Sequence, residues 1–233
     1  AAIIGSSSSG VVIPVAEAVT IPKNVLMISP GATSPYITDL PEDKQKDMLF
    51  RTCPSDKLQW VVLGKLAASL YKTASVMYVN NAYGQGLAQE FRKSFTRHGG
   101  MVYTMIPHGE EVAQSYAKDL RNAFARMYST KPFRSGKSDV LCVFSYPEHA
   151  KVYVKEAIEK YQCEAFLFCD GSKSEELAQA IGPEKLEGMM GTAPGRTIGE
   201  GFIKFNAAYT AEYGEFPASP FIANAYDATA LIG

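Results

Sequence analysis

Short runs rich in β-branched and apolar residues alternate with longer amphipathic runs through the middle of the chain, and this rhythm restricts the fold more than any other feature. The runs with strand character cover residues 74–79, 101–106, 140–144 and 165–168, with a fifth candidate at 188–193. Strands that alternate with helices are typical of βαβ units on a parallel sheet. The sequence therefore predicts an α/β lobe in which helices flank a parallel sheet.

Apolar spacing predicts the buried faces of the helices in this block. Leu87, Phe91 and Phe95 recur every four residues before His98-Gly99-Gly100 ends the pattern. Leu177 and Ile181 mark the inward face of a short helix after the fourth strand. We expect these side chains to pack against the sheet.

The two ends of the chain have a different pattern. Strands are expected at residues 2–5 and 25–29, around an Ala- and Val-rich helix that starts near Pro14. A later helix has apolar residues at a spacing of four, which predicts that its buried face consists of Leu58, Val62, Leu66 and Leu70. The tail is mostly helical, with Phe202, Phe205 and Tyr209 expected to face inward.

Neither end piece is long enough to form a domain alone, so we expect both to belong to one lobe. The chain would then cross between lobes near residue 72 and return near residue 195. The prediction is a two-lobe α/β fold with a multi-strand hinge. Lobe 1 comprises residues 1–71 plus 195–233, and lobe 2 comprises residues 72–194.

The charge balance and the hydropathy pattern exclude several classes of partner. The chain has 23 Lys and Arg against 24 Asp and Glu, a formal net charge of -1, so no basic surface for nucleic acid or anionic lipid is indicated. No apolar run approaches the roughly 20 residues that cross a bilayer, so no membrane insertion is expected. The 4 cysteines include no CxxC pair and are expected to be buried thiols.

Two turns at the ends of the lobe 1 strands have hydroxyl groups. Ser6-Ser7-Ser8-Ser9-Gly10 follows the first strand, and Ser29-Pro30-Gly31-Ala32-Thr33-Ser34-Pro35 closes the second. Ligands of open parallel sheets lie outside the carboxyl ends of the strands, so both turns would face one crevice and could hold a carboxylate or phosphate. A serine-rich turn with one helix cap and a proline-bounded turn explain the same residues without a ligand.

Tyr83 and Asp170 follow strands of lobe 2 and would point at the same crevice from the opposite side. A lone tyrosine is more often a packing residue, and Asp170-Gly171 alone is typical of a turn. Enzyme signals fail, because the segment around Ser7 breaks the G-x-S-x-G pattern and the 3 histidines are too scattered for a metal cluster. No catalytic residue, metal or cofactor is predicted.

Five segments, taken in order and at their spacing, are similar to those of a known family. They are Ser8-Ser9-Gly10, residues 25–35, Phe50-Arg51-Thr52, Tyr83-Gly84-Gln85-Gly86 and Ala225-Tyr226-Asp227-Ala228. With them the chain resembles the type I periplasmic binding proteins, specifically the branched-chain amino acid (Leu/Ile/Val) binding branch of ABC transport systems. The resemblance covers nearly the whole chain and implies two α/β lobes that close by hinge motion.

In lobe 1, the resemblance implies contacts to the α-carboxylate of an amino acid. The serine of the first turn would be Ser9, or Ser8 if the alignment shifts by one residue. The backbone and hydroxyl pair of the second turn would be Gly31 and Thr33.

In lobe 2, the resemblance implies that Asp170 meets the α-ammonium and that Tyr83 covers the ligand. Asp170 stands where the family more usually has Glu, so the ammonium would sit about one methylene deeper or be reached through water. Ser145 and Tyr146 correspond loosely to the loop of the side-chain pocket.

The implied function is that of a non-catalytic solute-binding protein, periplasmic or at the cell surface. It would deliver an amino acid to the membrane permease of an ABC transporter, with aliphatic or branched-chain amino acids favoured. A ligand-sensing domain of a receptor or regulator with the same fold is the alternative. Family members have two further β-α units before the counterpart of Ala1 and a segment after that of Gly233, so we expect a chain truncated at both ends.

Overall fold

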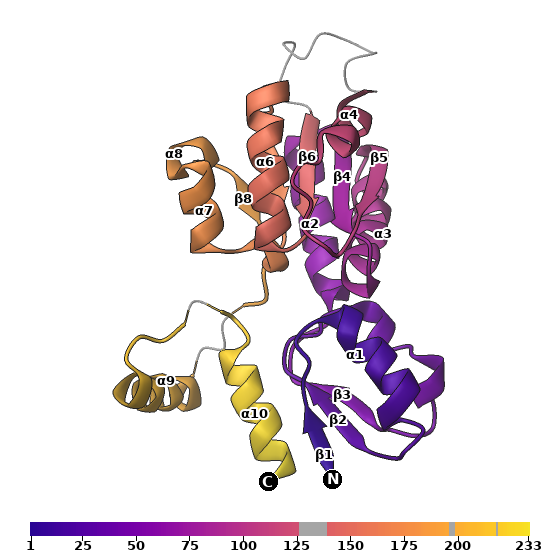
Figure 1. The fold of residues 1–233 in the computed structure, drawn as a ribbon, viewed down its shortest axis with the longest axis vertical. Coiled ribbons are helices and arrows are strands. Elements are labelled where there is room, and N and C mark those ends of the chain that lie inside the picture. The colour runs from indigo at the N-terminus through magenta and orange to yellow at the C-terminus, as the bar shows by residue number, and fades with distance from the viewer. Residues whose placement is uncertain (126–138, 196–198, 218) are drawn as a thin grey trace. The chain divides into compact units, whose positions relative to one another are not determined.

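The computed structural model describes residues 1–125, 139–195, 199–217 and 219–233, which fold as two α/β units (Figure 1). Unit 1 comprises Ala1–Ser55 and Pro194–Gly233, and unit 2 comprises Asp56–Ala193. The return to unit 1 lies next to the expected position. The first boundary precedes helix α2 (Asp56–Leu70) instead of following it, because α2 packs on a helix of unit 2.

Unit 2 is built on a parallel sheet of five strands in the order β5-β4-β6-β7-β8. The strands are β4 (Thr73–Val79), β5 (Met101–His108), β6 (Asp139–Phe144), β7 (Phe166–Phe168) and β8 (Met190–Gly191). All five strands expected in this block are present. The chain leaves β4 for β5 on one side and then continues with β6 on the other, so the strand order switches direction beside β4.

Helices cover both faces of this sheet (Figure 1). Besides α2 they are α3 (Ala82–Arg97), α4 (Ala117–Ala125), α6 (Pro147–Tyr161), α7 (Glu175–Ile181) and α8 (Pro183–Leu186). Alternate residues of β6 enter opposite cores: Val140 and Cys142 pack with α2 and α3, whereas Leu141 and Val143 pack with α4 and α6. Burial on both faces explains why the strands read as continuous apolar runs.

The apolar residues predicted to face the sheet from α3 and α7 are buried. Leu87, Phe91 and Phe95 of α3 are completely inaccessible to solvent, and Leu177 and Ile181 of α7 are 3% and 4% exposed. The i, i+4 spacing was a reliable guide here because polar residues separate the apolar ones on these helices.

The predicted buried face of α2 is wrong. The residues expected to face the core are largely exposed: Leu58 by 75%, Val62 by 59% and Leu70 by 43%. The opposite face is completely buried through Trp60, Leu63 and Ala67. A Cβ on Gly64 would lie 2.5 Å from Ser94 of α3, so the small residues of α2 define the face that can approach α3. Apolar residues on both faces made the spacing ambiguous.

Unit 1 contains a parallel sheet in the order β1-β2-β3. The strands are β1 (Ala2–Ile4), β2 (Leu26–Ser29) and β3 (Leu49–Arg51). Strand β3 was not predicted, because the short apolar run at residues 48–50 lies between the charged residues Asp47 and Arg51. Helix α1 (Ser9–Val15) and the π-helical turn Ala16–Thr20 connect β1 to β2. The expected start near Pro14 is wrong, since α1 begins at Ser9 and contains Pro14.

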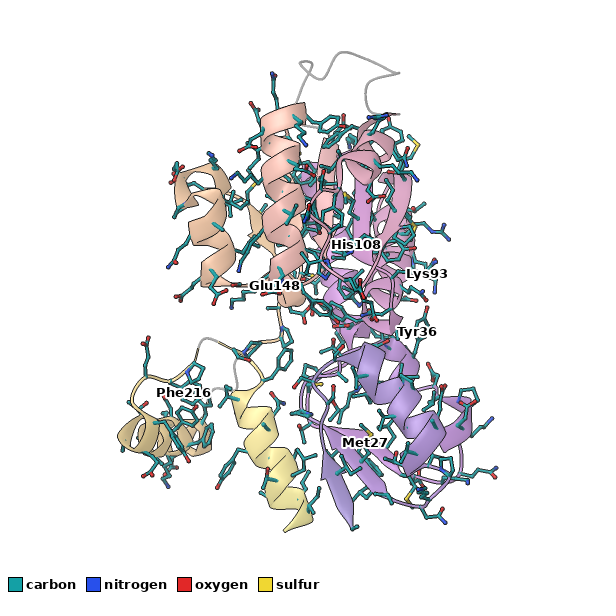
Figure 2. The ribbon with its side chains drawn as sticks, in the orientation of Figure 1. Met27, Tyr36, Lys93, His108, Glu148 and Phe216 are labelled. Carbon is teal, nitrogen blue, oxygen red and sulfur yellow. The ribbon has the colours of Figure 1, made fainter. Side chains whose placement is uncertain are left out.

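The tail of unit 1 forms α9 (Glu200–Tyr213) and α10 (Ile222–Ile232), and α10 contacts β1 and β2. The expectation that Phe202, Phe205 and Tyr209 face a core holds only in part, because α9 has no buried residue. These three rings instead pack around Phe216 at centroid distances of 5.1–5.7 Å (Figure 2).

All four cysteines are buried and none forms a disulfide. Among the described residues, no helix combines the length and the apolar character that crossing a bilayer requires.

The assignment of the α2 face predicts opposite outcomes for two neighbouring substitutions. Leu63→Ala should lower the free energy of unfolding by about 2–5 kcal/mol, because it opens a cavity between α2 and the sheet. Val62→Ala removes an exposed side chain and should change it by about 0.5 kcal/mol or less. Urea unfolding followed by circular dichroism measures both, and a reversed ranking would mean that α2 packs through its other face.

Candidate functional site

The carboxyl ends of the unit 2 strands bring several polar side chains to one edge of the sheet. Tyr83 lies just after β4, Tyr146 just after β6 and Asp170 just after β7. The strand order reverses at β4, which has β5 on one side and β6 on the other. In open α/β sheets this is where the ligand crevice forms.

Tyr83 is placed by the N-terminal cap of α3. Asn81 has an extended backbone, and its side-chain oxygen accepts hydrogen bonds from the N–H groups of Tyr83 and Gly84, both at 3.1 Å. This cap satisfies two of the free N–H groups of the first turn. It fixes Tyr83 as the second residue of the helix, 5% exposed.

Tyr83 and Asp170 are joined by a direct hydrogen bond. The Tyr83 hydroxyl donates to Asp170 Oδ1 at 3.0 Å and accepts the Gly171 N–H at 2.9 Å. A Cβ on Gly171 would lie 2.3 Å from that hydroxyl oxygen, so only glycine allows this approach. Burial, followed by the nearby charge of Asp170, raises the pKa of Tyr83 well above 10, and the phenol stays a neutral donor.

The carboxylate of Asp170 is buried beside neutral groups. The residue is 8% exposed, and burial raises the pKa of its carboxyl group, against the opposing effect of hydrogen bonds from Tyr83 and Gln59. No lysine or arginine among the described residues forms an ion pair with it. A buried carboxylate without a cationic neighbour is a strong acceptor for a positively charged group.

Gln59 of α2 is a site residue that sequence reasoning missed. Its Nε2 donates to Asp170 Oδ1 at 3.1 Å and to the backbone carbonyl of Thr192 at 2.8 Å. Three residues earlier, Asp56 is 1% exposed and close enough to Tyr83 for its charge to raise the pKa of that phenol. The misassigned face of α2 hid both residues, because their side of the helix was expected to face solvent.

Tyr146 stacks on Tyr83, and Ser145 is buried at the start of the loop that follows β6. The rings of Tyr83 and Tyr146 stack with centroids 5.5 Å apart and an interplanar angle of 11°. Ser145 is completely buried, and its hydroxyl is 2.9 Å from His108 Nε2. The structure thus brings Tyr146 to Tyr83, whose hydroxyl contacts Asp170, and it buries Ser145 against His108.

His108 is a neutral part of this support. It is the last residue of β5 and lies among the side chains between the sheet and α6 (Figure 2), and burial lowers its pKa from 6.5 to about 4. Nδ1 is 2.9 Å from the Gly109 carbonyl, which can only accept, so Nδ1 bears the proton and Nε2 accepts the Ser145 hydroxyl.

In unit 1 the two predicted turns meet at the carboxyl ends of β1 and β2. The Ser29 hydroxyl donates to the Ser6 carbonyl at 2.6 Å, and the Ser34 N–H donates to Ser9 Oγ at 3.1 Å. Ser9 is 1% exposed and is the first residue of α1. The expectation that both turns lie at one edge of the sheet is confirmed by these bonds.

Thr33 is the notable side chain of this edge. It is 1% exposed, and within the described part of the chain its hydroxyl has no hydrogen-bond partner. Gly31 lies against the first turn, where a Cβ would come 3.1 Å from Ser7. Ser8 is the N-cap of α1, although its side chain makes no capping bond. Roles of Ser8, Ser9, Gly31 and Thr33 in binding a ligand stay predictions.

Arg51 of β3 holds the second turn from behind. Its Nη1 donates to the carbonyls of Ala32, Thr33 and Ser34 at 3.4, 3.2 and 2.7 Å, and its Nη2 donates to the Thr38 hydroxyl. Guanidinium donors of fixed geometry suit such a cluster of acceptors. In the sequence, Phe50-Arg51-Thr52 was only one of the segments that resemble the family. The structure shows that Arg51, at the end of β3, holds the carbonyl groups of the second turn.

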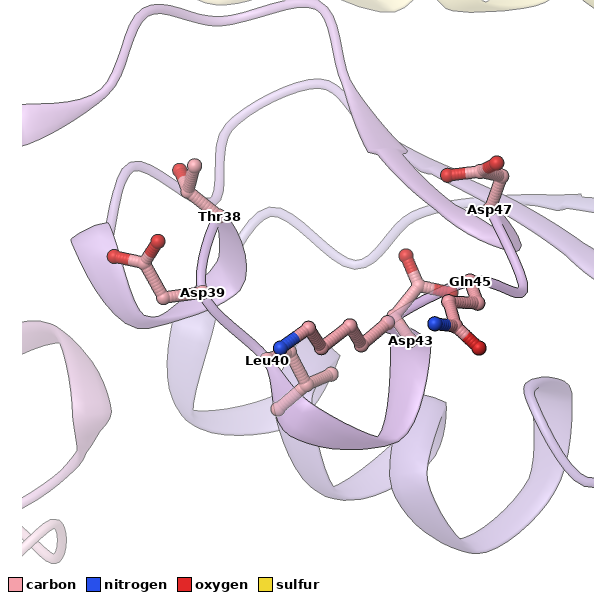
Figure 3. Close-up of a pocket in the computed structure, with 7 residues that line it drawn as sticks. Thr38, Asp39, Leu40, Asp43, Gln45 and Asp47 are labelled. Atoms are coloured by element: carbon pink, nitrogen blue, oxygen red, sulfur yellow. The ribbon is translucent and has the colours of Figure 1, made fainter.

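A separate pocket in unit 1 does not belong to this edge. It is lined by the loop between β2 and β3, including Asp39, Asp43 and Asp47 (Figure 3). The Asp43 carboxylate accepts the N–H groups of Met48 and Leu49 at 2.8 and 3.3 Å, so it closes the loop onto β3. Throughout the described ranges, no group of His, Cys, Asp or Glu side chains could hold a metal ion.

Comparison with known proteins gives matches along the whole chain. The model of a family described as the receptor family ligand binding region matches residues 1–233. The Leu/Ile/Val-binding protein homolog 2 of Brucella abortus (strain 2308) is 31% identical over 194 residues, which cover 82% of this chain and 47% of that protein. The chain therefore spans about half the length of the curated relatives it matches.

Solved structures agree with these matches. The leucine binding protein LivK of Thermotoga maritima has a TM-score of 0.76 at 23% identity, covering 99% of this chain and 62% of that one. A type 1 periplasmic binding protein of Bordetella pertussis has a TM-score of 0.80 at 18% identity, covering 99% and 63%. The predicted α/β fold of the type I periplasmic binding proteins is confirmed, as is the similarity to the Leu/Ile/Val-binding branch.

The contacts of the Tyr83 hydroxyl predict a stability cost for its removal. Tyr83→Phe should lower the free energy of unfolding by about 1–3 kcal/mol, because it leaves the Gly171 N–H without its acceptor and Asp170 without one donor. Tyr36→Phe, at a tyrosine that is 44% exposed, is the matched control and should change stability by about 0.5 kcal/mol or less. Equal effects of the two substitutions in urea unfolding would contradict the hydrogen bonds described.

Proposed function

The chain belongs to the family described as the receptor family ligand binding region, and on that premise we propose that it binds a free amino acid without transforming it. The ligand's α-carboxylate binds the turns of unit 1 through Ser9, Gly31 and Thr33. Its α-ammonium binds unit 2 at Asp170, with Tyr83 and Tyr146 against the ligand. Aliphatic and branched-chain amino acids are the favoured ligands, since relatives of this chain are named for leucine, isoleucine and valine.

The observation that supports this proposal most is the environment of Asp170. The residue is 8% exposed, and its carboxylate accepts hydrogen bonds from neutral donors of Tyr83 and Gln59. An ammonium group would supply the missing positive charge in a place of low dielectric, where such a pair is strong. An acid that lacks an ammonium group would instead be repelled.

The unit 1 turns suit the other pole of the same ligand. Thr33 offers a buried hydroxyl with no partner within the described residues, and a buried polar group of this kind is costly unless a ligand satisfies it. Arg51 binds the carbonyl groups of residues 32–34, so these acceptors are occupied. A ligand carboxylate at this turn would therefore meet hydroxyl and amide groups, which can donate hydrogen bonds to it.

This pairing explains how ligand binding could drive a conformational change. Only a molecule with both charged groups contacts both units, so only such a molecule favours a closed state over an open one. In the proposed role the protein works outside the cytoplasm, and the permease of an ABC transporter recognises its closed form. The relatives are named as binding proteins, which favours transport over the sensing alternative and over catalysis.

A thermal-shift screen tests the proposal across many candidate ligands at once. Purified protein is heated with each of the common amino acids and with small carboxylates. A true ligand at 100 times its dissociation constant should add about 2.7 kcal/mol to the free energy of unfolding. Leucine, isoleucine or valine should give the largest shifts. A shift with none of the amino acids would refute the proposed function.

The substitution Thr33→Val should weaken ligand binding without lowering the stability of the protein. Removal of an unpaired buried hydroxyl should leave stability unchanged or slightly raised, yet the affinity for the amino acid should fall about tenfold or more, because a bond to a charged carboxylate is lost. Titration calorimetry and urea unfolding measure the two quantities.

Thr73→Val is the matched control. Thr73 is also buried with an unpaired hydroxyl, but it lies at the amino end of β4, so the affinity should not change. Wild-type affinity in Thr33→Val would remove Thr33 from the site.

A further inference from the structure

We propose that Gln59 of α2 is a positioning residue for the ammonium-binding carboxylate: its amide group bridges Asp170 to the backbone at Thr192 and fixes the direction of the carboxylate. This inference rests on the proposed function, because it assigns the purpose of the contact to that same site. It adds a residue that neither the loops of the sheet nor the sequence resemblance indicated.

The chemistry of the two contacts determines the orientation of the amide. Nε2 of Gln59 lies 3.1 Å from Asp170 Oδ1 and 2.8 Å from the Thr192 carbonyl oxygen. An ionised carboxylate and a carbonyl can only accept hydrogen bonds. The amide nitrogen must therefore face both, and its two N–H groups are used. The amide oxygen in that place would meet two acceptors and be repelled.

The bridge connects three parts of unit 2 that are distant in sequence. Gln59 belongs to α2, Asp170 to the 3-10 turn after β7, and Thr192 to the segment after β8. The next residue of α2, Trp60, is completely buried in the core, so the helix is a rigid support for the Gln59 side chain. The turn after β7 is itself held by hydrogen bonds of Cys169 and Ser172 to each other and to the Val143 carbonyl, and Gln59 adds a side-chain donor to Asp170 itself.

Gln59 and Tyr83 act on the same oxygen from different directions. Both donate to Asp170 Oδ1, one from α2 and the other from α3. Two donors on one oxygen define the plane and the tilt of a carboxylate more closely than either alone. This control matters for an aspartate, since its short side chain has little freedom to reach a ligand.

The donation from Gln59 also favours the ionised form of Asp170. Burial raises the pKa of the carboxyl group, and the hydrogen bonds from Tyr83 and Gln59 oppose that rise. The other titratable groups at this place are the Tyr83 phenol, with a pKa well above 10, the Cys169 thiol, with a pKa of about 11, and the Asp56 carboxyl group of α2. Without Gln59, Asp170 should therefore take up its proton at a higher pH.

The test compares Gln59→Met with Gln85→Met in the full chain. Methionine keeps the length of glutamine and removes its donors. Gln85 of α3 is exposed, and its amide donates only to Asn80 on the surface at 3.0 Å. Gln59→Glu is a second variant that keeps the shape and places an acceptor against two acceptors. Circular dichroism confirms that each variant folds.

The first readout needs no ligand. In protein labelled with carbon-13 at aspartate carboxyl groups, the midpoint of the Asp170 titration should move to higher pH in Gln59→Met, move further in Gln59→Glu, and stay in place in Gln85→Met. An unchanged midpoint in both Gln59 variants would overturn the inference. A shifted midpoint together with a wild-type protein that binds no amino acid would refute the proposed function while leaving the positioning contact intact.

The second readout is the affinity for leucine across pH. Gln59→Met should bind about tenfold more weakly near neutral pH, and its affinity should begin to fall at a higher pH than that of the wild type. A loss of equal size at every pH, or the same loss in Gln85→Met, would show a general structural effect and contradict a positioning role.

Discussion

Keeping the carboxylate of Asp170 buried without a cationic neighbour among the described residues costs free energy, and the site in unit 2 is built around that cost. Asp170 lies at the carboxyl edge of the unit 2 sheet, where burial raises its pKa and neutral donors offset part of that cost. The surroundings serve this group: Gly171 lacks a side chain so that the Tyr83 hydroxyl can approach, and Asn81 caps the helix that holds Tyr83. A buried carboxylate with a perturbed pKa at the carboxyl edge of a sheet is a candidate ligand site, and we propose that a ligand's ammonium group completes it.

Unit 1 has the complementary deficiency. Its turns meet through the bonds of Ser29 and Ser9, Arg51 holds the carbonyls of the second turn, and the Thr33 hydroxyl stays without a partner in the described part of the chain. Among the described residues, Asp170 thus has no cationic partner and the Thr33 hydroxyl has no hydrogen-bond partner. A zwitterion supplies both, which is why we propose an amino acid rather than a simple acid or amine.

Much of this could be predicted from the sequence, for identifiable reasons. Strands buried on both faces appear as apolar runs, and Leu87, Phe91 and Phe95 recur on a helix that is mostly polar between them. The strands and the buried face of α3 in unit 2 could therefore be predicted. The buried face of helix α2 was predicted wrongly because both of its faces are apolar. The close approach of Gly64 to Ser94, which shows the correct face, is visible only in the structure. The same error concealed Gln59. Strand β3 was missed because its short apolar run lies between the charged residues Asp47 and Arg51, so the role of Arg51 also needed the structure.

Ligand analogues bound to the unmodified protein test whether both charged groups of an amino acid are recognised. Titration calorimetry would compare the best-bound amino acid with its deaminated acid and its decarboxylated amine, which keep the same side chain. Each analogue should bind about 30-fold more weakly or worse, since each leaves one buried group unpaired. If either analogue bound as tightly as the amino acid, the corresponding pole would not be recognised and the account would be contradicted.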